Sequence, residues 1–419
     1  MEGVEFRKKY YLIFFSSILG PLTTNALVPI FEQLRLNFNL SSIAVISLAI
    51  TFYILPFAIF QLFAGTFSDI VDKKKVVLLG YVIFISGLFV TLLAVLIRNF
   101  YLFLIAFLFL GIGFSFVNPT ILALLNVISP EKKKGLLMGL YNSSASIGVS
   151  MGALLSGLFA SSFSNGWIFI FILNPILAIL FFILFEISLR NCEPLICRPF
   201  DVETSELSQG QIEKSNSKFI ATLRQLKAGF NLKIFLLGII GLLCFFSVIA
   251  LTNTLYEQMR MSMKDSNERE IVFYVSLILA VNGLISVILS PIAGICLKKI
   301  NPFLMMGIGF ACMLPIILLP SGKSFLDFLI INILAYVGSA LVWPALFKVS
   351  MEGDPKKSGT ISAIINSFRF IGYSMVGPFY ILFGIPVVYY FVLLFNILAI
   401  LIIIITKILK YNKEYSNFK

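Results

Sequence analysis

The chain has 419 residues, of which 59% are hydrophobic and only 12% are charged. A soluble globular domain carries about 25% charged residues, so this chain cannot bury its apolar surface in a water-soluble core, and lipid has to be its solvent. The net charge of +12 comes from short basic clusters between apolar runs, which is typical of membrane topology signals and not of a nucleic-acid-binding face.

Twelve apolar runs are long enough to span a bilayer, which takes about 20 predominantly apolar residues. They predict helices at 10–31, 42–67, 76–97, 101–127, 135–160, 167–188, 234–257, 271–297, 303–320, 325–348, 359–383 and 387–407. The first run is too long for the apolar part of a signal peptide, so we expect it to remain as the first helix. The predicted fold class is an all-α integral membrane protein with two six-helix bundles.

Basic residues alternate between the two sides of these predicted crossings. With a cytoplasmic N-terminus, the inner segments carry 25 of the 32 Lys and Arg residues and the outer segments carry six. Because Lys and Arg accumulate in cytoplasmic loops, we expect both termini in the cytoplasm and the protein in the cytoplasmic membrane. The one remaining basic residue, Arg369, lies well inside the eleventh predicted helix.

One long hydrophilic stretch, residues 189–233, separates a first bundle (1–188) from a second (234–419). Its second part carries apolar residues at helical spacing: Phe219, Ile220, Leu223, Leu226 and Phe230. This pattern predicts an amphipathic helix on the inner membrane surface. A linker helix between the bundles is favoured over a partner-binding helix.

The two halves of the chain repeat. Matching pairs are Asn142 and Asn366, Gly148 and Gly372 (both 224 residues apart), and Gly65 and Gly294 (229 apart). Parallel repeats of this kind place the substrate site near the midplane, between the halves.

The segment Gly65 to Lys74, GTFSDIVDKK, resembles the signature G-x-x-x-D-x-x-G-R-K/R of the major facilitator superfamily. Over essentially its whole length the chain is similar to the twelve-helix drug:H⁺ antiporter type. The resemblance implies that Gly65, Asp69, Lys73 and Lys74 form a cytoplasmic latch for the outward-open state, with Asp69 facing the positive N-terminal end of the eleventh helix. A plain inner turn is the alternative, and Asp72 stands where the family has Gly.

The fifth predicted helix resembles the antiporter motif G-x8-G-x3-G-P-x2-G-G. The matching glycines are Gly139, Gly148, Gly152 and Gly157. Small residues let helices pack closely, which is also the purely structural interpretation. Ala153 replaces the proline of the motif, and Phe107 stands where proton-coupled members often have a buried arginine in helix 4.

Charged residues inside a membrane are costly and usually functional. Arg369 lies about 16 Å into its helix, with no acidic residue at the same depth. The functional hypothesis is that it contacts an anionic group of the substrate; hydrogen bonding to helix ends near the inner mouth is the interpretation that is favoured. Proton coupling would have to use Asp327, Glu257 or Glu32, which sit near the outer ends of helices.

Uncharged polar residues are the other candidates for a substrate cavity. They are Asn25, Tyr53, Asn118, Asn253, Asn282, Tyr336, Trp343 and Asn366. Polar contacts between helices, worth about 0.6–2 kcal/mol each, are the competing interpretation. The family resemblance also implies that helices 3, 6, 9 and 12 face lipid.

The sequence therefore predicts a secondary transporter that works by alternating access and exports drug-like or metabolite molecules, with proton coupling as an open option. An importer or facilitator of a small organic anion using Arg369, and a non-transporting membrane sensor, are the alternatives. The sequence has no histidine and no G-x-x-x-x-G-K-[ST] loop for ATP. We expect no enzymatic activity, metal, cofactor or nucleic acid; the partners expected are a small molecule, the bilayer and H⁺, and the protein is expected to be a monomer.

Overall fold

The computed structural model describes residues 8–70, 72–129, 134–189, 230–351 and 358–416. All regular structure in these ranges is helical, and eleven of the spans are long and apolar enough to cross a membrane. The predicted all-helical, multi-pass character is confirmed. The predicted linker at 189–233 and its amphipathic helix lie almost entirely outside the described residues.

The first span is a broken helix, in which η1 (Lys8–Ile18), α1 (Leu19–Asn25), η2 (Val28–Ile30) and α2 (Phe31–Asn37) follow one another. The short α3 (Ile43–Ile46) precedes α4, and η4 (Gly166–Ile168) precedes α8. The remaining helices before residue 190 are α4 (Leu48–Ile70), α5 (Lys73–Leu96), α6 (Phe100–Ile128), α7 (Lys134–Ser162) and α8 (Phe169–Leu189). Those after residue 230 are α11 (Leu232–Ser262), α12 (Glu268–Cys296), α13 (Pro302–Met313) with η5 (Leu314–Ser321), α14 (Phe325–Met351) and α15 (Ser358–Ser416).

Short polar side chains start several of these helices. Asp72 accepts a hydrogen bond from the backbone N–H of Lys74 at the start of α5. Asn99, Asn231 and Asn267 do the same at the starts of α6, α11 and α12. Because the first N–H groups of a helix have no partner within it, these caps fix where each apolar run becomes helical.

The long element α15 consists of two helices that meet at Gly384, whose φ of 69° and ψ of 173° are not helical. This conformation is essentially restricted to glycine. The sequence predicts two separate helices here, at 359–383 and 387–407, whereas Ile364–Ile408 counts as one of the eleven spans. The number of twelve crossings therefore stays a prediction.

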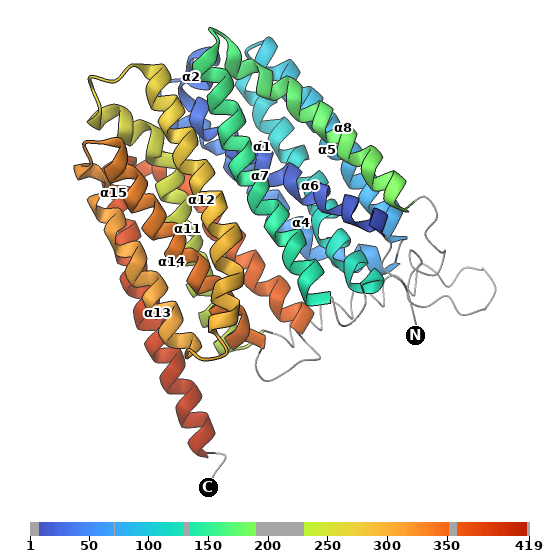
Figure 1. The fold of residues 1–419 in the computed structure, drawn as a ribbon, viewed down its shortest axis with the longest axis vertical. Helices are drawn as coiled ribbons and strands as arrows, with labels where there is room; N and C mark the ends of the chain where they lie inside the picture. The colour runs from blue at the N-terminus through green and yellow to red at the C-terminus, as the bar shows by residue number, and fades with distance from the viewer. Residues whose placement is uncertain (1–7, 71, 130–133, 190–229, 352–357, 417–419) are drawn as a thin grey trace, which may run out of the picture.

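The helices form two neighbouring sets in Figure 1: α1 to α8 lie on one side and α11 to α15 on the other. Both chain termini lie at one end of the molecule, which we call the terminus face; α2 lies at the opposite end, the distal face. The sets contact each other chiefly through α7 with α12 and α4 with α15.

The internal repeat of the sequence has a counterpart in helix packing. A Cβ on Gly148 of α7 would collide with the backbone of Ile18, and a Cβ on Gly372 of α15 would collide with the backbone of Leu242. Ile18 and Leu242 are 224 residues apart, as are the two glycines. In the two sets of helices, corresponding pairs of helices thus cross at corresponding glycines.

Large apolar side chains cover the outer surface of α5, α8, α13 and the second half of α15. Examples are Val82, Ile176, Leu304 and Leu394, each more than half exposed. Exposure of so much apolar surface to water would be unfavourable. The outer surfaces of these helices are therefore suited to contact lipid chains. This agrees with the expectation for helices 3, 6, 9 and 12.

Candidate functional site

Arg369 of α15 lies within a cluster of aromatic rings. Its guanidinium carbon is 3.9 Å from the ring centroid of Phe245, 4.5 Å from that of Trp343 and 5.3 Å from that of Phe370. We call Phe245, Trp343 and Phe370 the aromatic cage. These rings come from α11, α14 and α15, so the cage exists only when all three helices are packed.

The charge of Arg369 has no partner of opposite sign among the described residues. Its side chain takes part in none of their ion pairs, and its buried Nε has no hydrogen-bond partner. Contact with aromatic faces contributes about 0.5–2 kcal/mol, while the loss of water costs an ion several kcal/mol. The cage therefore holds the guanidinium in place without neutralising it.

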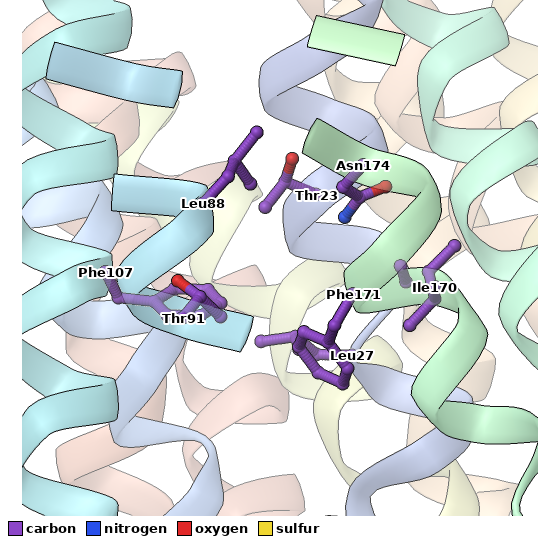
Figure 2. Close-up of a pocket in the computed structure, with 9 residues that line it drawn as sticks. Thr23, Leu27, Leu88, Thr91, Phe107, Ile170, Phe171 and Asn174 are labelled. Atoms are coloured by element: carbon purple, nitrogen blue, oxygen red, sulfur yellow. The ribbon is translucent and has the colours of Figure 1, made fainter. Parts of the chain in front are cut away.

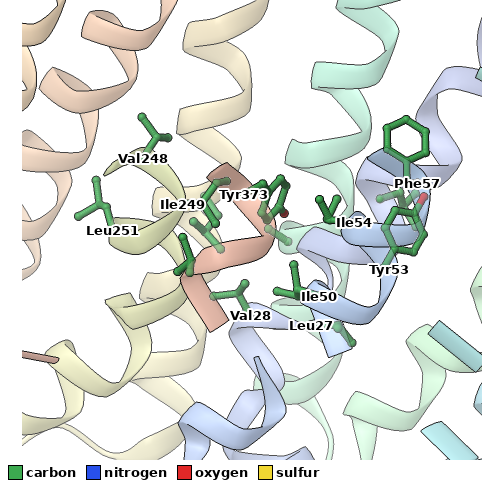
Figure 3. Close-up of a cluster of buried hydrophobic side chains, with 14 of the residues drawn as sticks. Leu27, Val28, Ile50, Tyr53, Ile54, Phe57, Val248, Ile249, Leu251 and Tyr373 are labelled. Atoms are coloured by element: carbon green, nitrogen blue, oxygen red, sulfur yellow. The ribbon is translucent and has the colours of Figure 1, made fainter. Parts of the chain in front are cut away.

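The cage borders the other set of helices. The ring of Phe370 packs edge-on against Phe57 of α4, with 4.8 Å between centroids, and Phe57 in turn packs against Phe114 of α6. Figure 3 shows buried side chains at this boundary, with Tyr373 of α15 between Ile54 of α4 and Ile249 of α11. Arg369 is thus positioned by the second set of helices and faces the boundary with the first.

Gln61 of α4 is a polar residue at this boundary that the sequence did not indicate. The hydroxyl of Thr51 donates to the carbonyl of Ser374 at 2.9 Å, and together with the contact between Phe57 and Phe370 this bond fixes α4 antiparallel to α15. The same register brings Gln61, one turn beyond Phe57, level with Asn366. The Nε2 of Gln61 is buried and has no hydrogen-bond partner.

Four of the predicted polar residues hydrogen-bond to nearby protein groups. Asn25 donates to the carbonyl of Pro21 at 2.8 Å, and Asn118 accepts from the hydroxyl of Tyr141 at 2.9 Å. Asn282 donates to Asn332 at 3.1 Å, and the hydroxyl of Tyr336 pairs with that of Thr252 at 3.0 Å. These bonds join neighbouring helices or turns of one helix, which is the behaviour of polar groups that hold helices together.

The remaining predicted residues keep unpaired polar atoms. The hydroxyl of Tyr53, the Oδ1 of Asn253 and the Nε1 of Trp343 are buried with no hydrogen-bond partner. Tyr53 packs against Phe57 and Phe114, next to the ring that touches the cage. Asn366 is partly exposed, one turn below Arg369 on α15.

A small cavity lies within the first set of helices, apart from Arg369. Figure 2 shows Thr23, Leu88, Thr91, Phe107, Ile170 and Asn174 around it. Its volume of about 10 Å³ has room for a single water molecule. None of the predicted substrate-binding residues lines it, so it offers a solute no site.

An ion pair joins the two sets at the distal face. Glu32 of α2 is 3% exposed and accepts hydrogen bonds from Arg35 at 2.7 Å and from Arg260 of α11 at 2.7 Å. Gln33 also reaches across, to Glu268 of α12, at 3.4 Å. Glu32, a predicted proton-coupling residue, is thus held by two cations.

The other two acidic candidates have local partners. Glu257 of α11 accepts a hydrogen bond from the hydroxyl of Tyr380 of α15. Asp327 is exposed and accepts from the backbone N–H groups of Lys323 and Ser324, both at 2.9 Å. Asp327 therefore caps the start of α14.

The proposed latch is described only in part. Gly65 and Asp69 lie in the last turns of α4, and their side chains are outside the described set. Lys73 is buried, and Lys74 forms an ion pair of 2.7 Å with Glu186 of α8.

The glycines of α7 touch two different helices. A Cβ on Gly152 would collide with the backbone of Leu22, in the first span, and one on Gly157 would collide with Ser276 of α12. Gly139 lies in α7, in a part whose side-chain surroundings are not described.

The comparison with known families identifies this helical architecture. Residues 13–378 match the model of the Major Facilitator Superfamily. The chain belongs to this superfamily. Its members are membrane transporters and not enzymes, so the chain is a multi-pass transporter for which a small molecule is the substrate and the bilayer the surrounding medium.

Proteins of similar sequence cover different parts of the chain. The Uncharacterized MFS-type transporter YttB of Bacillus subtilis is 26% identical over 86% of this chain and 84% of its own length. The Vacuolar membrane amino acid uptake transporter fnx2 of Schizosaccharomyces pombe is 31% identical over 32% of this chain and 23% of its own length. The Aminotriazole resistance protein of Saccharomyces cerevisiae is 25% identical over 34% of this chain and 27% of its own length.

Proposed function

We propose that this transporter is a secondary transporter that moves a small solute by alternating access. In this proposal α15 crosses the membrane twice, and twelve crossings form two six-helix bundles, residues 1–188 and 234–419, joined by the linker 189–233. The bundles rock against each other around a site at Arg369, near the middle of the first of the two helices that form α15. The repeat of close glycine contacts in both halves supports this division.

The observation that carries the proposal is where the two sets of helices touch. At the distal face Glu32 pairs with Arg260. Deeper in, Ser150 donates to the carbonyl of Ala280 at 2.8 Å, and Thr51 donates to that of Ser374. The rings of Phe57 and Phe370 also meet across the boundary, with 4.8 Å between centroids. This pattern supports a state that is closed on the distal side of Arg369.

We further propose that both termini are cytoplasmic, that the protein sits in the cell membrane as a monomer, and that it exports drug-like or metabolite molecules. The partial likeness to an aminotriazole resistance protein supports export. Gly65, Asp69, Lys73 and Lys74 would close the cytoplasmic side when the distal contacts open. Glu257 and Glu32, acids that bond across helices, are the candidates for proton coupling.

The alternative is import or facilitated passage of a small organic anion. Two observations favour it: Arg369 has no acidic partner among the described residues, and part of the chain is similar to a protein named as an amino acid uptake transporter. A sensor that moves no solute is the third possibility.

Flux in proteoliposomes separates these possibilities. Purified protein is reconstituted, and the uptake of labelled cationic, anionic and neutral solutes is followed with and without an imposed pH gradient. Protein-free liposomes give the background. Export by proton exchange predicts that a solute accumulates inside vesicles that are acidic inside, because protons leave as the solute enters. Entry without a pH gradient that stops when the inner and outer solute concentrations are equal indicates facilitated passage. No flux of any solute above background in correctly folded protein would contradict a transport function.

A further inference from the structure

The unpaired polar atoms around Arg369 share one chemical property. The Nε of Arg369, the Nε1 of Trp343 and the Nε2 of Gln61 are hydrogen-bond donors, and all three are buried without a partner. A buried donor left without an acceptor costs about 1–3 kcal/mol, and more when it is charged. A site with several such donors is therefore suited to a ligand that brings acceptors.

The described acids of α11, α12 and α14 lie toward the distal ends of these helices and do not supply these acceptors. Glu257 bonds to Tyr380, Glu268 to Gln33, and Asp327 to the backbone at the start of its own helix. The described part of the chain thus leaves the positive charge of Arg369 to be balanced by something else. A cationic solute would meet like charge at this point, and a neutral solute would leave the charge unbalanced.

The surroundings also specify an apolar part. Phe245, Trp343 and Phe370 surround the guanidinium, and Phe57 extends this aromatic surface into the first set of helices. Flat apolar groups pack well on such rings. Binding of the apolar part against Phe57 and Phe370 would involve both sets of helices at once, as a transported solute must.

We propose that the site takes an amphiphilic organic anion, whose acidic group binds Arg369 with help from Trp343 and Gln61, and whose flat apolar part packs against the aromatic surface that Phe57 and Phe370 form. This inference rests on the proposed transport function, because it makes Arg369 part of the transport site, and it holds for either direction of transport.

The two tryptophans of the chain allow binding to be measured without transport. Trp343 belongs to the aromatic cage, whereas Trp167 packs against Phe171 in the first set of helices. In the variant Trp167→Phe, intrinsic fluorescence reports on the cage alone. This variant is titrated with three solutes of equal skeleton and different charge: 4-phenylbutyrate, 4-phenylbutylamine and 4-phenylbutanol. Benzenesulfonate and phenyl phosphate extend the test to other acidic groups.

The expected result is a saturable change in Trp343 emission with at least one of the three anions, at a Kd at least 10-fold lower than that of the amine or the alcohol. Charge-assisted hydrogen bonds contribute about 1.5–3 kcal/mol, which corresponds to about 10- to 100-fold in affinity. Anion binding should therefore weaken by about that factor in Arg369→Gln and by a smaller factor in Arg369→Lys, which keeps the charge but loses the planar fork.

A matched control removes a positive charge elsewhere. Lys323→Gln takes a lysine from the exposed start of α14 and should leave anion binding unchanged. Because Arg369→Gln could fail to fold, Gln61→Leu provides a second variant, which removes a donor without touching the charge and should weaken anion binding several-fold. Tighter binding of the amine, or no response to any of the three anions at about 10 mM, well above the Kd of a weak ligand, overturns the proposal.

This test separates the inference from the proposed function. Anion binding without flux in proteoliposomes would retain the anion site and reject transport. Flux of cations that is insensitive to Arg369→Gln would retain transport and reject the anion site.

Discussion

Two charged side chains inside this protein differ in the partners that surround them. Glu32 is almost fully buried and bonds to two arginines, Arg35 and Arg260, while Arg369 packs against aromatic rings and takes part in no ion pair of the described residues. An ion with good partners stabilises one arrangement of helices, and an ion without one remains available to a ligand. At the residue scale, Glu32 thus contributes to closure of the distal face, and Arg369 is the candidate for binding.

Replacing Arg260 by Gln should loosen the distal contact without unfolding the protein, because Arg35 still neutralises Glu32. The side chain of Arg260 is half exposed, so the pair contributes only about 0.2–1 kcal/mol, or up to about 5-fold in the population that is open distally. The measurement is the rate at which a charged thiol reagent modifies a single cysteine, introduced by Ser276→Cys into a chain whose five native cysteines have been replaced.

Two outcomes bear on this prediction. The rate should rise in Arg260→Gln and stay unchanged in the surface control Lys323→Gln. High salt should reduce the difference, because it screens a half-exposed pair. An unchanged rate in Arg260→Gln at low salt would show that this ion pair does not control closure.

At the scale of elements, each of the two sets contains a close helix crossing at a corresponding glycine. Gly148 of α7 meets the backbone of Ile18, and Gly372 of α15 meets that of Leu242. Membrane helices associate through close packing more than through hydrophobic burial, since lipid chains are as apolar as the helix surfaces. These glycines therefore set how near each pair of helices can come.

Gly148→Ala and Gly372→Ala should each destabilise the protein by about 1–3 kcal/mol, the usual cost of forcing extra atoms into a packed contact. Gly307→Ala is the matched control: Gly307 lies in α13, and a Cβ added there would have no neighbouring atom within 4 Å, so alanine should be neutral or slightly stabilising. Thermal unfolding in detergent, monitored by circular dichroism, gives the comparison. Equal midpoints for all three variants would show that the crossings tolerate a methyl group.

The sequence predicts where the helices lie far better than what their side chains touch. Bilayer thickness sets the length of each apolar run, so the sequence alone places α6, α8 and α12 to within a few residues. Contacts depend on how each helix is rotated, and helices that are apolar on all sides carry little signal of rotation. Arg369 could therefore be singled out as an isolated charge, but its aromatic cage, from three helices, could not.

The same limit applies to the polar candidates. Asn282 is buried against Asn332, a residue 50 positions away that no motif connects with it. Gln61 resembles any other polar residue in an apolar run until the register of α4 against α15 is known. Asp327 has a recognisable helix-start position, and that signal could have assigned it to capping from the sequence.

At the scale of the whole molecule, alternating access requires the distal contacts between the two sets to break in every cycle. A chemical bridge between them should therefore stop transport. Glu32→Cys and Arg260→Cys, combined in a chain without native cysteines and joined by a short, reducible bifunctional thiol reagent, would hold the distal face closed.

The expected result is loss of nearly all flux after cross-linking and its return after reduction. Each single-cysteine variant should show the same flux before and after treatment with the reagent, whatever its flux relative to the unmodified chain, which shows that the reagent alone does not stop transport. Full transport in completely cross-linked protein would mean that the two sets of helices do not separate at this face.

The junction at Gly384 has a practical consequence. Two helices meet there at a single residue with positive φ, whereas α11 and α12 are joined by the longer segment from Met263 to Asn267. A junction of one residue provides no exposed loop to which an antibody could bind. An epitope inserted after Asp265 would therefore be displayed beside an intact fold, while the same peptide spliced in at Gly384 would have to unwind the ends of both helices.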